Sequence, residues 1–247
     1  MEGMETKLLN NFFSKTKKSF IRVFICFCLL AGISNNLFSQ VLATQRTIKF
    51  PVWVLIEPEP SCVEDLDESK NGALTFAITH MRTSVPFILE GLIYGWNFTY
   101  TPSDKMRKVE EYFEYTPISE IKLGDKNISF SQLKTDESRF SCWVAYERTD
   151  QQYALRQHWN SVKFPKIAGT GSGSIRDGDN GIHDAYAEAI LKAVREYVQG
   201  FTKNKPKEIS GTVLLENYPL LSVQSGRYVA KLELLVNISR IVPYSSF

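Results

Sequence analysis

Two neighbouring runs of small and acidic residues form the part of the chain whose composition could support chemistry. The first, Gly169-Thr-Gly-Ser-Gly-Ser174, contains Gly171 and Gly173 and precedes a helical pattern. A glycine-rich turn that enters a helix can present backbone N–H groups to an anion such as phosphate. The run lacks the sixth-position glycine of a dinucleotide-binding motif and the Gly-Lys-Ser/Thr of a phosphate loop. We therefore expect a surface loop here, with anion binding as the alternative.

The second run offers hard oxygen ligands of the kind that calcium prefers. It contains Asp177, Asp179 and Asp184, and Glu188 falls where an EF-hand loop counted from Asp177 has its last ligand. An EF-hand also needs Asp or Asn at its fifth position and glycine at its sixth, and this stretch meets neither requirement. Capping of a helix N-terminus explains the acidic residues without a metal. We expect neither a metal ion nor a cofactor.

The histidine and serine patterns assign no catalytic residue. His80, His158 and His183 fall in different expected elements, and none has the spacing of a zinc site. A Gly-x-Ser-x-Gly motif is also missing from the sequence. His183 and its neighbour Asp184 fit the start of a helix better than acid–base chemistry. The candidate ligand-binding residues are therefore Gly171, Gly173, Asp177, Asp179, His183 and Asp184.

An amphipathic helix expected over His183–Phe201 must position these residues. Its apolar residues recur at steps of three and four, while charged residues occupy the other face. The segments Ile209–Leu215 and Arg227–Ile238 are rich in β-branched and apolar residues and predict two strands that cover the apolar face. Another strand is expected before the glycine-rich run, near Val162–Ile167.

A similar pattern earlier in the chain predicts an internal duplication. Ile48-Lys-Phe-Pro51 is echoed by Val162-Lys-Phe-Pro165, and a helical pattern spans Ala73–Tyr94. Its apolar positions align with those of the later helix, and all are expected to be buried: Ala77, Met81, Val85 and Ile88 match Ile190, Val194, Val198 and Phe201. The expected fold class is α+β, with two β-α-β-β modules whose helices pack on antiparallel or mixed sheet. A single α+β domain without duplication is the alternative.

The two modules span residues 45–150 and 156–247, and the first carries an insertion over residues 103–133. In the insertion we expect a short helix over Lys105–Tyr115 and a small hairpin around Gly124. Pro86 interrupts the first long helical pattern, so a kink or two shorter helices are expected there. The strand that contains Trp96, Phe98 and Tyr100 alternates aromatic and polar residues, and its aromatic face is expected in the core.

The N-terminus has the order of a secretory signal peptide. Basic residues between Lys15 and Arg22 precede eleven uncharged residues, Val23–Ile33, and small and polar residues follow. This run is shorter than the roughly twenty apolar residues that a membrane-spanning helix needs. We expect removal of residues 1–39, or cleavage after Ala43, and an uncleaved anchor is the alternative.

Removal of the signal peptide changes the charge of the protein. Residues 1–39 contain five Lys/Arg and two Asp/Glu, which leaves 24 basic and 25 acidic residues and a net charge of −1. Nucleic-acid binding depends on concentrated positive charge, so we expect no nucleic-acid partner. Cys62 and Cys142 remain in the exported part and are a candidate disulfide in an oxidising compartment. A lone buried thiol at Cys142 is the alternative.

The expected function is that of a noncatalytic binding or structural component of the cell envelope, exported to the periplasm or secreted. Its partner would be another envelope protein or a glycan, and it would meet the membrane only through an uncleaved signal. The alternative is a secreted hydrolase or metal-dependent enzyme that uses residues 169–184. A pocket that gathers the acidic residues and His183 would favour the enzyme. An exposed apolar surface or an open strand edge would favour the binding component.

Overall fold

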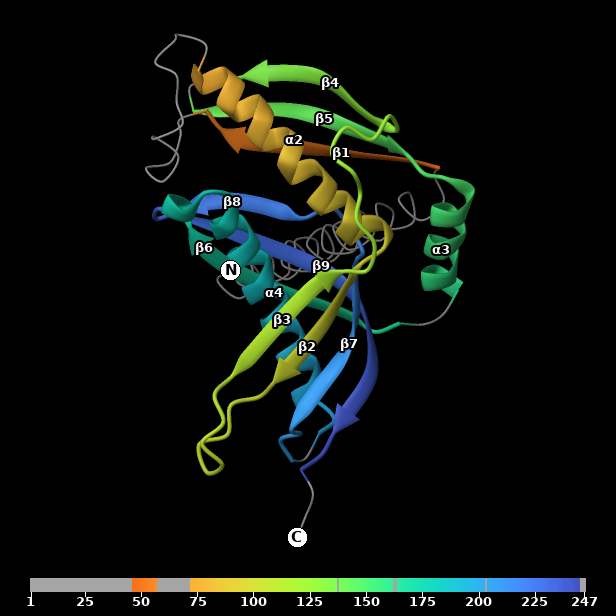
Figure 1. Cartoon of the computed structure of the whole chain (residues 1–247), viewed down its shortest axis with the longest axis vertical. Helices are drawn as coiled ribbons and strands as arrows, with labels where there is room; N and C mark the ends of the chain where they lie inside the picture. Colours follow the sequence, from red (N-terminus) through yellow and green to blue (C-terminus); the bar gives the residue numbers. More distant parts are fainter. Residues whose placement is uncertain (1–45, 57–71, 137, 162–163, 203, 245–247) are drawn as a thin grey trace, which may run out of the picture. The chain divides into compact units, whose positions relative to one another are not determined.

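A computed structural model describes residues 46–56, 72–136, 138–161, 164–202 and 204–244 of the chain. These residues form helices and antiparallel sheets, which confirms the α+β class (Figure 1). The helices are α2 (Gly72–Ile93), α3 (Asp150–Ser161) and α4 (Asp179–Gln199), with a short 3-10 turn at Ile175–Asp177. Among the described residues, no helix is long and apolar enough to cross a membrane.

A three-stranded sheet has the order β1-β5-β4 and is entirely antiparallel. Its strands are β1 (Thr47–Leu55), β5 (Arg139–Glu147) and β4 (Ile128–Thr135). Alternate side chains of β1 and β5 are buried, as expected for strands with one covered face. Helix α2 covers that face, and the Cys142 Sγ atom of β5 lies 3.0 Å from the Met81 Sδ atom of α2.

The second sheet has the order β3-β2-β7-β9-β6, and β8 pairs with β9 beside β7. Its strands are β2 (Trp96–Thr101), β3 (Tyr112–Pro117), β6 (Lys166–Ser174), β7 (Glu208–Leu215), β8 (Leu220–Gln224) and β9 (Arg227–Val242). The aromatic face of β2 is buried, as expected from its alternation. Trp96 reaches α2 at Gly91, where an added Cβ would lie 2.2 Å from the indole ring.

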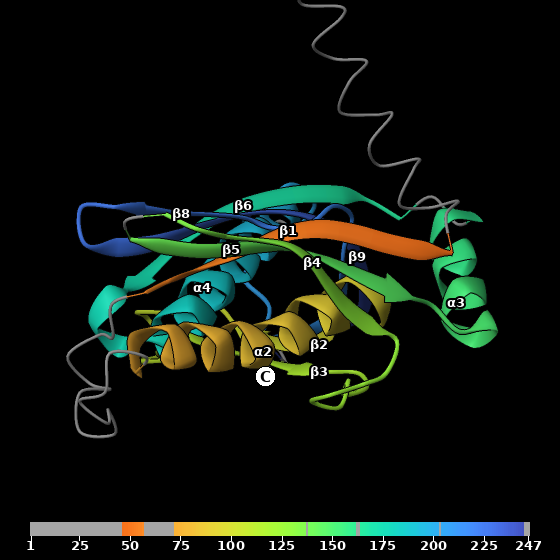
Figure 2. The same ribbon diagram turned by 90° about the horizontal axis from the view of Figure 1, so that it is seen from above.

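The two helices form a layer that both sheets share. Figure 2 shows β1, β5, β6, β8 and β9 in one layer, with α2 and α4 in the layer beneath. The helices contact each other through Phe87 of α2 and Tyr186 of α4, whose ring centroids are 5.0 Å apart. Phe87 also contacts Trp96 of β2 at 5.3 Å, so this side chain joins the helix layer to the larger sheet.

Helix α2 is continuous, so the expectation of two shorter helices is wrong. Pro86 lies inside it and is buried. Gly95 terminates the helix at a positive φ of 81°, and its N–H donates to the Glu90 carbonyl oxygen at 2.8 Å. A glycine in the left-handed region is a common end for a helix, because it carries no Cβ to clash with the backbone.

Helix α4 begins four residues earlier than expected, at Asp179 instead of His183, and ends at Gln199. Phe201 therefore lies outside the helix and is 50% exposed, and Ile88, its expected counterpart in α2, is half-buried. The expectation that both side chains are buried is wrong. The other matched positions, such as Val85 and Val194, are fully buried.

The expected helix over Lys105–Tyr115 is also wrong. The Asp104 carboxylate accepts hydrogen bonds from the N–H groups of Met106 and Arg107 at 3.0 and 3.2 Å, which favours a tight turn over a helix. Asp104 and Val109 form a β-bridge that closes the turn, and β3 follows at Tyr112. The hairpin expected around Gly124 is wrong as well, because β3 and β4 belong to different sheets.

Candidate binding cleft between two strand edges

The glycine-rich run expected to be a loop is strand β6, so that expectation is wrong. Gly169, Gly171 and Gly173 face α4, and a Cβ on Gly171 would lie 2.1 Å from the Ala185 carbonyl oxygen. Real Cβ atoms do not approach backbone that closely, so the glycines allow strand and helix to pack in direct backbone contact. This packing accounts for Gly171 and Gly173 without a bound anion.

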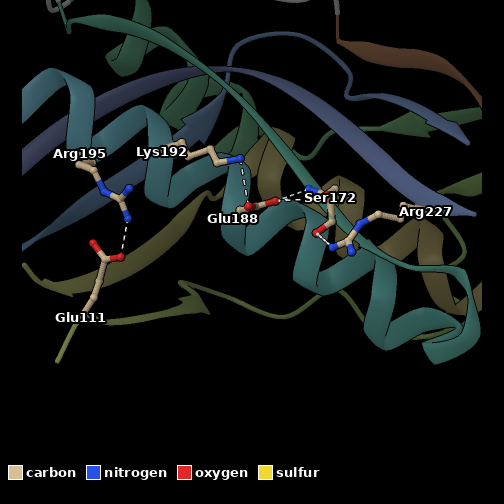
Figure 3. Close-up of polar contacts among 6 residues, drawn as sticks. All are labelled: Glu111, Ser172, Glu188, Lys192, Arg195 and Arg227. Atoms are coloured by element: carbon tan, nitrogen blue, oxygen red, sulfur yellow. Dashed lines mark hydrogen bonds and ion pairs between the residues drawn. The ribbon is translucent and has the colours of Figure 1, made fainter. Parts of the chain in front are cut away.

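At the outer edge of β6, the backbone groups of Ser172 contact the side chains of Glu188 and Arg227, as Figure 3 shows. The Ser172 N–H donates to the Glu188 carboxylate at 2.5 Å, and Arg227 lies 3.5 Å from the Ser172 carbonyl oxygen. Lys192 pairs with the same carboxylate at 3.0 Å. Burial alone would raise the pKa of Glu188, but Lys192 and Ser172 together outweigh it and lower that pKa. Backbone groups that a further strand could have paired are thus already occupied at this position.

The acidic residues that follow β6 lie in different surroundings. Asp177 lies in the 3-10 turn and is exposed, and Asp184 is exposed on the first turns of α4. Asp179 is the first residue of α4, and its Oδ1 atom lies 3.1 Å from the Nε2 atom of His80 in α2. The same carboxylate is 3.5 Å from the Ser84 hydroxyl. Asp179 therefore ties the start of α4 to the middle of α2.

His183 lies one turn further along α4. Its ring centroid is 4.2 Å from that of Phe87 in α2. Removal from water lowers the pKa of His183, against the opposing effect of Asp179 and Asp184, so the imidazole is held neutral to a lower pH than usual. This side chain is an additional contact between the two helices.

Asp179 and His183 line a cleft of about 50 Å³, and the other four candidate residues do not. Its base consists of side chains from α2 and α4, among them Phe87 and Tyr186. One wall is β1, and the opposite wall comes from β8 and the residue before it. The lining residues of the walls are Phe50, Pro51, Val52 and Trp53 on one side and Pro219 and Leu221 on the other.

The β1 wall is a strand edge that no other described strand pairs with. The Arg148 N–H donates to the Arg46 carbonyl oxygen at 3.1 Å, and the Ile56 N–H donates to the Ser138 carbonyl oxygen at 3.0 Å. Antiparallel pairs alternate between hydrogen-bonded and open positions, so the even-numbered residues of β1 bond to β5. The odd-numbered residues consequently direct their backbone groups toward the open edge: the N–H and C=O groups of Thr47, Lys49, Trp53 and Leu55, and the C=O group of Pro51.

Pro51 fits this arrangement, because its missing N–H falls on the open side. Pro51 lies in the middle of β1, and proline is tolerated in a strand where its absent donor faces an unpaired edge. Lys49 and Pro51 are residues that discourage uncontrolled pairing of an edge strand. The carbonyl of Pro51 and the N–H groups of Lys49 and Trp53 remain directed outward.

The opposite wall is a second strand edge. Ser225 and Gly226 connect β8 to β9, and their φ angles of 50° and 72° are those of a tight two-residue hairpin turn. In such a hairpin the residues next to the turn bond to each other, and the bonding positions then alternate. Leu221 and Val223 therefore direct their backbone groups away from β9. No described strand pairs with β8 on that side.

The chemistry of the cleft is that of packing and backbone pairing. The Ser84 hydroxyl lies 2.9 Å from the His80 carbonyl oxygen of its own helix and 3.5 Å from the Asp179 carboxylate, so its shorter hydrogen bond is to the backbone. Asp179 is engaged by His80. No group of three or more His, Cys, Asp or Glu side chains among the described residues could hold a metal ion.

Cys142 faces the core between β5 and α2 and is buried. Burial raises the pKa of its thiol to about 11, which keeps the thiol protonated at neutral pH. Cys62 lies outside the described residues, so a disulfide between the two stays a prediction.

Comparison with known proteins places the chain in a family. A protein-family model of unknown function matches residues 35–244. The chain belongs to this family. It is 30% identical over 230 residues to an "Uncharacterized protein" of Treponema pallidum (strain Nichols), with 91% of this chain and 95% of that relative covered. No solved structure matches the chain.

The sequence pattern indicates the α4 side of the cleft, through Asp179 and His183, and does not indicate the sides formed by α2 and β8. His80, Ser84 and Phe87 lie on α2, nearly a hundred residues before α4, and nothing in their local pattern links them to Asp179. The sequence contains one indication that β1 is an edge strand. Pro51 within an alternating apolar segment is typical of an edge strand.

Proposed function

We propose that the mature chain is a noncatalytic binding component of the cell envelope, with another envelope protein or a glycan as its partner. The observation that carries this proposal is the cleft between β1 and β8, where two strand edges border an apolar base. Open edges and exposed apolar surface are features of binding proteins. The enzyme alternative required Asp177 and Asp184 in the same pocket as Asp179 and His183, and they do not line it.

We propose export because of the order of charges and apolar residues in the first forty residues. Those residues lie outside the described part of the chain, so the support comes from the sequence alone. Amino-terminal sequencing of the protein from its native host is expected to begin at Gln40 or Thr44. An intact Met1 on correctly located protein would contradict the signal peptide.

We also propose that the two halves arose by duplication. The supporting pattern is that β1 pairs antiparallel with β5 around α2, as β6 pairs antiparallel with β9 around α4. The halves differ in that β7 pairs with β9, whereas β2 pairs with β7 and β3. The strand that would complete the first module is thus part of the second sheet.

Binding is tested by affinity capture of the mature protein from its native envelope after mild crosslinking. One sample is treated with protease and a second with glycan-degrading enzymes before capture, so that loss of the captured material identifies its class. A strain that carries Asp177→Asn and Asp184→Asn is expected to retain normal function, because neither residue lines the cleft and a binding component needs no polar catalytic group there. Loss of function in that strain, with normal protein level and fold, would favour the enzyme.

A further inference from the structure

We propose that the cleft between β1 and β8 takes an extended apolar segment of another polypeptide, which adds the strand missing between the two edges. This inference rests on the proposed binding function and names the kind of partner. The two edges lie in one layer above α2 and α4 (Figure 2), and both line the same cleft. A segment placed there would pair with β1 on one side and with β8 on the other.

Backbone complementarity favours a polypeptide over other ligands. Thr47, Lys49, Trp53 and Leu55 direct both N–H and C=O groups toward the cleft side, and Pro51 directs its C=O group there. An extended peptide presents donors and acceptors at the spacing of a strand, about 3.3 Å per residue, and so matches this edge along its length. A glycan or a lipid has no such regular spacing.

The size of the cleft supports the same occupant. Its volume of about 50 Å³ is far below the several hundred Å³ typical of sites that enclose a small molecule. The space therefore fits single side chains that project from a strand lying along the edges. Most of the base is apolar, with Phe87, Ile88, Ile182 and Tyr186, and its polar side chains are Ser84, Asp179 and His183. The inserted side chains should therefore be small and mainly apolar.

The occupant is a segment that is free to pair on both sides, because each wall of the cleft is a strand edge. The described strands of a second copy already belong to sheets and cannot meet that condition. Lys49 and Pro51 on the β1 edge also act against pairing of two such edges. A different polypeptide with an extended stretch is therefore the occupant that the walls favour.

Site-specific photocrosslinking in the native host tests this proposal. A benzoylphenylalanine residue replaces Trp53 in one strain and Leu221 in another, and the crosslinked peptides are identified by mass spectrometry. Both positions are expected to crosslink to the same short stretch of one other protein. Crosslinks to a glycan, to a second copy of this chain, or to unrelated stretches from the two positions would overturn the proposal.

A matched pair of variants tests the backbone contribution. Lys49→Pro removes an N–H on the open edge of β1, next to the residues that line the cleft, and breaks no bond to β5, whereas Lys49→Ala removes only the side chain. Each is combined with the crosslinker at position 221, and thermal unfolding shows that both proteins are folded. Lys49→Pro is expected to lower the crosslinking yield about tenfold relative to Lys49→Ala, because a lost backbone hydrogen bond changes affinity by about that factor. Equal yields would contradict strand pairing.

Different results would contradict strand pairing in the cleft and the proposed binding function. If Lys49→Pro leaves capture of the partner from the envelope unchanged, the protein binds through another surface and only the cleft inference falls. If the wild-type protein captures no specific partner and the crosslinker strains give no product, the binding function falls together with it.

Discussion

Asp179 at the start of α4 holds His80 in the middle of α2, with 3.1 Å between the carboxylate Oδ1 and the imidazole Nε2 atoms. The His80 side chain is 9% exposed, while that of Asp179 is 42% exposed. The contact therefore joins two helices at the border of the cleft and fixes their spacing there.

Replacement of Asp179 by alanine should lower the free energy of unfolding by about 1 to 2 kcal/mol, because it removes a charge-assisted hydrogen bond and an anion at a helix N-terminus. Urea unfolding of the purified mature protein measures the change. Asp184→Ala is the control, since Asp184 is exposed on the same part of α4, and should cost less than about 0.5 kcal/mol. Equal losses would show that the contact with His80 contributes nothing.

Gly171→Ala should destabilise the protein by about 3 kcal/mol or more, because the new methyl group would meet backbone atoms that have no room to move. The clash is with the Ala185 carbonyl oxygen at 2.1 Å and the Ala189 nitrogen at 2.3 Å. Gly200→Ala is the control, since Gly200 has helical φ and ψ of −66° and −22° and its new methyl group would lie 3.2 Å from the Tyr197 carbonyl oxygen. A tolerated Gly171→Ala would argue that this glycine serves a ligand instead of the helix contact.

Val194→Asp should cost about 4 kcal/mol, because Val194 is fully buried on α4 and an aspartate there has no partner for its charge. If that variant does not fold, Val194→Ala should still cost about 2 kcal/mol. Arg195→Ala is the matched control on the polar face, where Arg195 pairs with Glu111 at 2.5 Å (Figure 3). A partly exposed pair of this kind contributes about 1 kcal/mol or less, so a cost near that of Val194→Asp would contradict the assigned faces.

The contribution of Glu188 to stability should depend on pH. Its pKa in the folded protein is lowered from the ordinary value of 4.5, so its stabilising effect is present above that pH and is lost as the pH falls through the lower, folded value. The stability difference between wild type and Glu188→Gln, measured by urea unfolding at several pH values, should shrink below about pH 4.5. Glu196→Gln changes an exposed carboxylate on the same helix and is the control. A difference that grows in acid would reverse the assigned sign.

The parts of the fold that the sequence predicts well are those with a regular period. Apolar residues at helical spacing identified α4 and α2, and the β-branched segments identified β7 and most of β9, because each pattern reports one buried face. Trp96 and its alternating neighbours were placed in the core for the same reason. These elements can be predicted without knowing which distant segments pack against them.

The errors arose where a distant partner determines the local structure. Gly171 lies in a strand because α4 packs against its backbone, and a glycine-rich strand carries none of the β-branched residues by which strands are recognised. The tight turn after Asp104 forms because its carboxylate accepts hydrogen bonds from the N–H groups of Met106 and Arg107. The cleft is lined by residues that lie far apart in the sequence, such as Asp179 and Ser84, and by strands β1 and β8 of two different sheets. No local pattern contains that information.

The pairing of β2 with β7 has a consequence for the kinetics of folding. Trp96 lies opposite Val213, so the β2–β3 pair cannot join the rest of the larger sheet until the chain has been synthesised past α4. Contacts between residues so far apart in sequence slow folding, because a long loop must close before any pairing is gained. The larger sheet is therefore completed late in synthesis, whereas β1, β5 and β4 can pair as soon as residue 147 has been made.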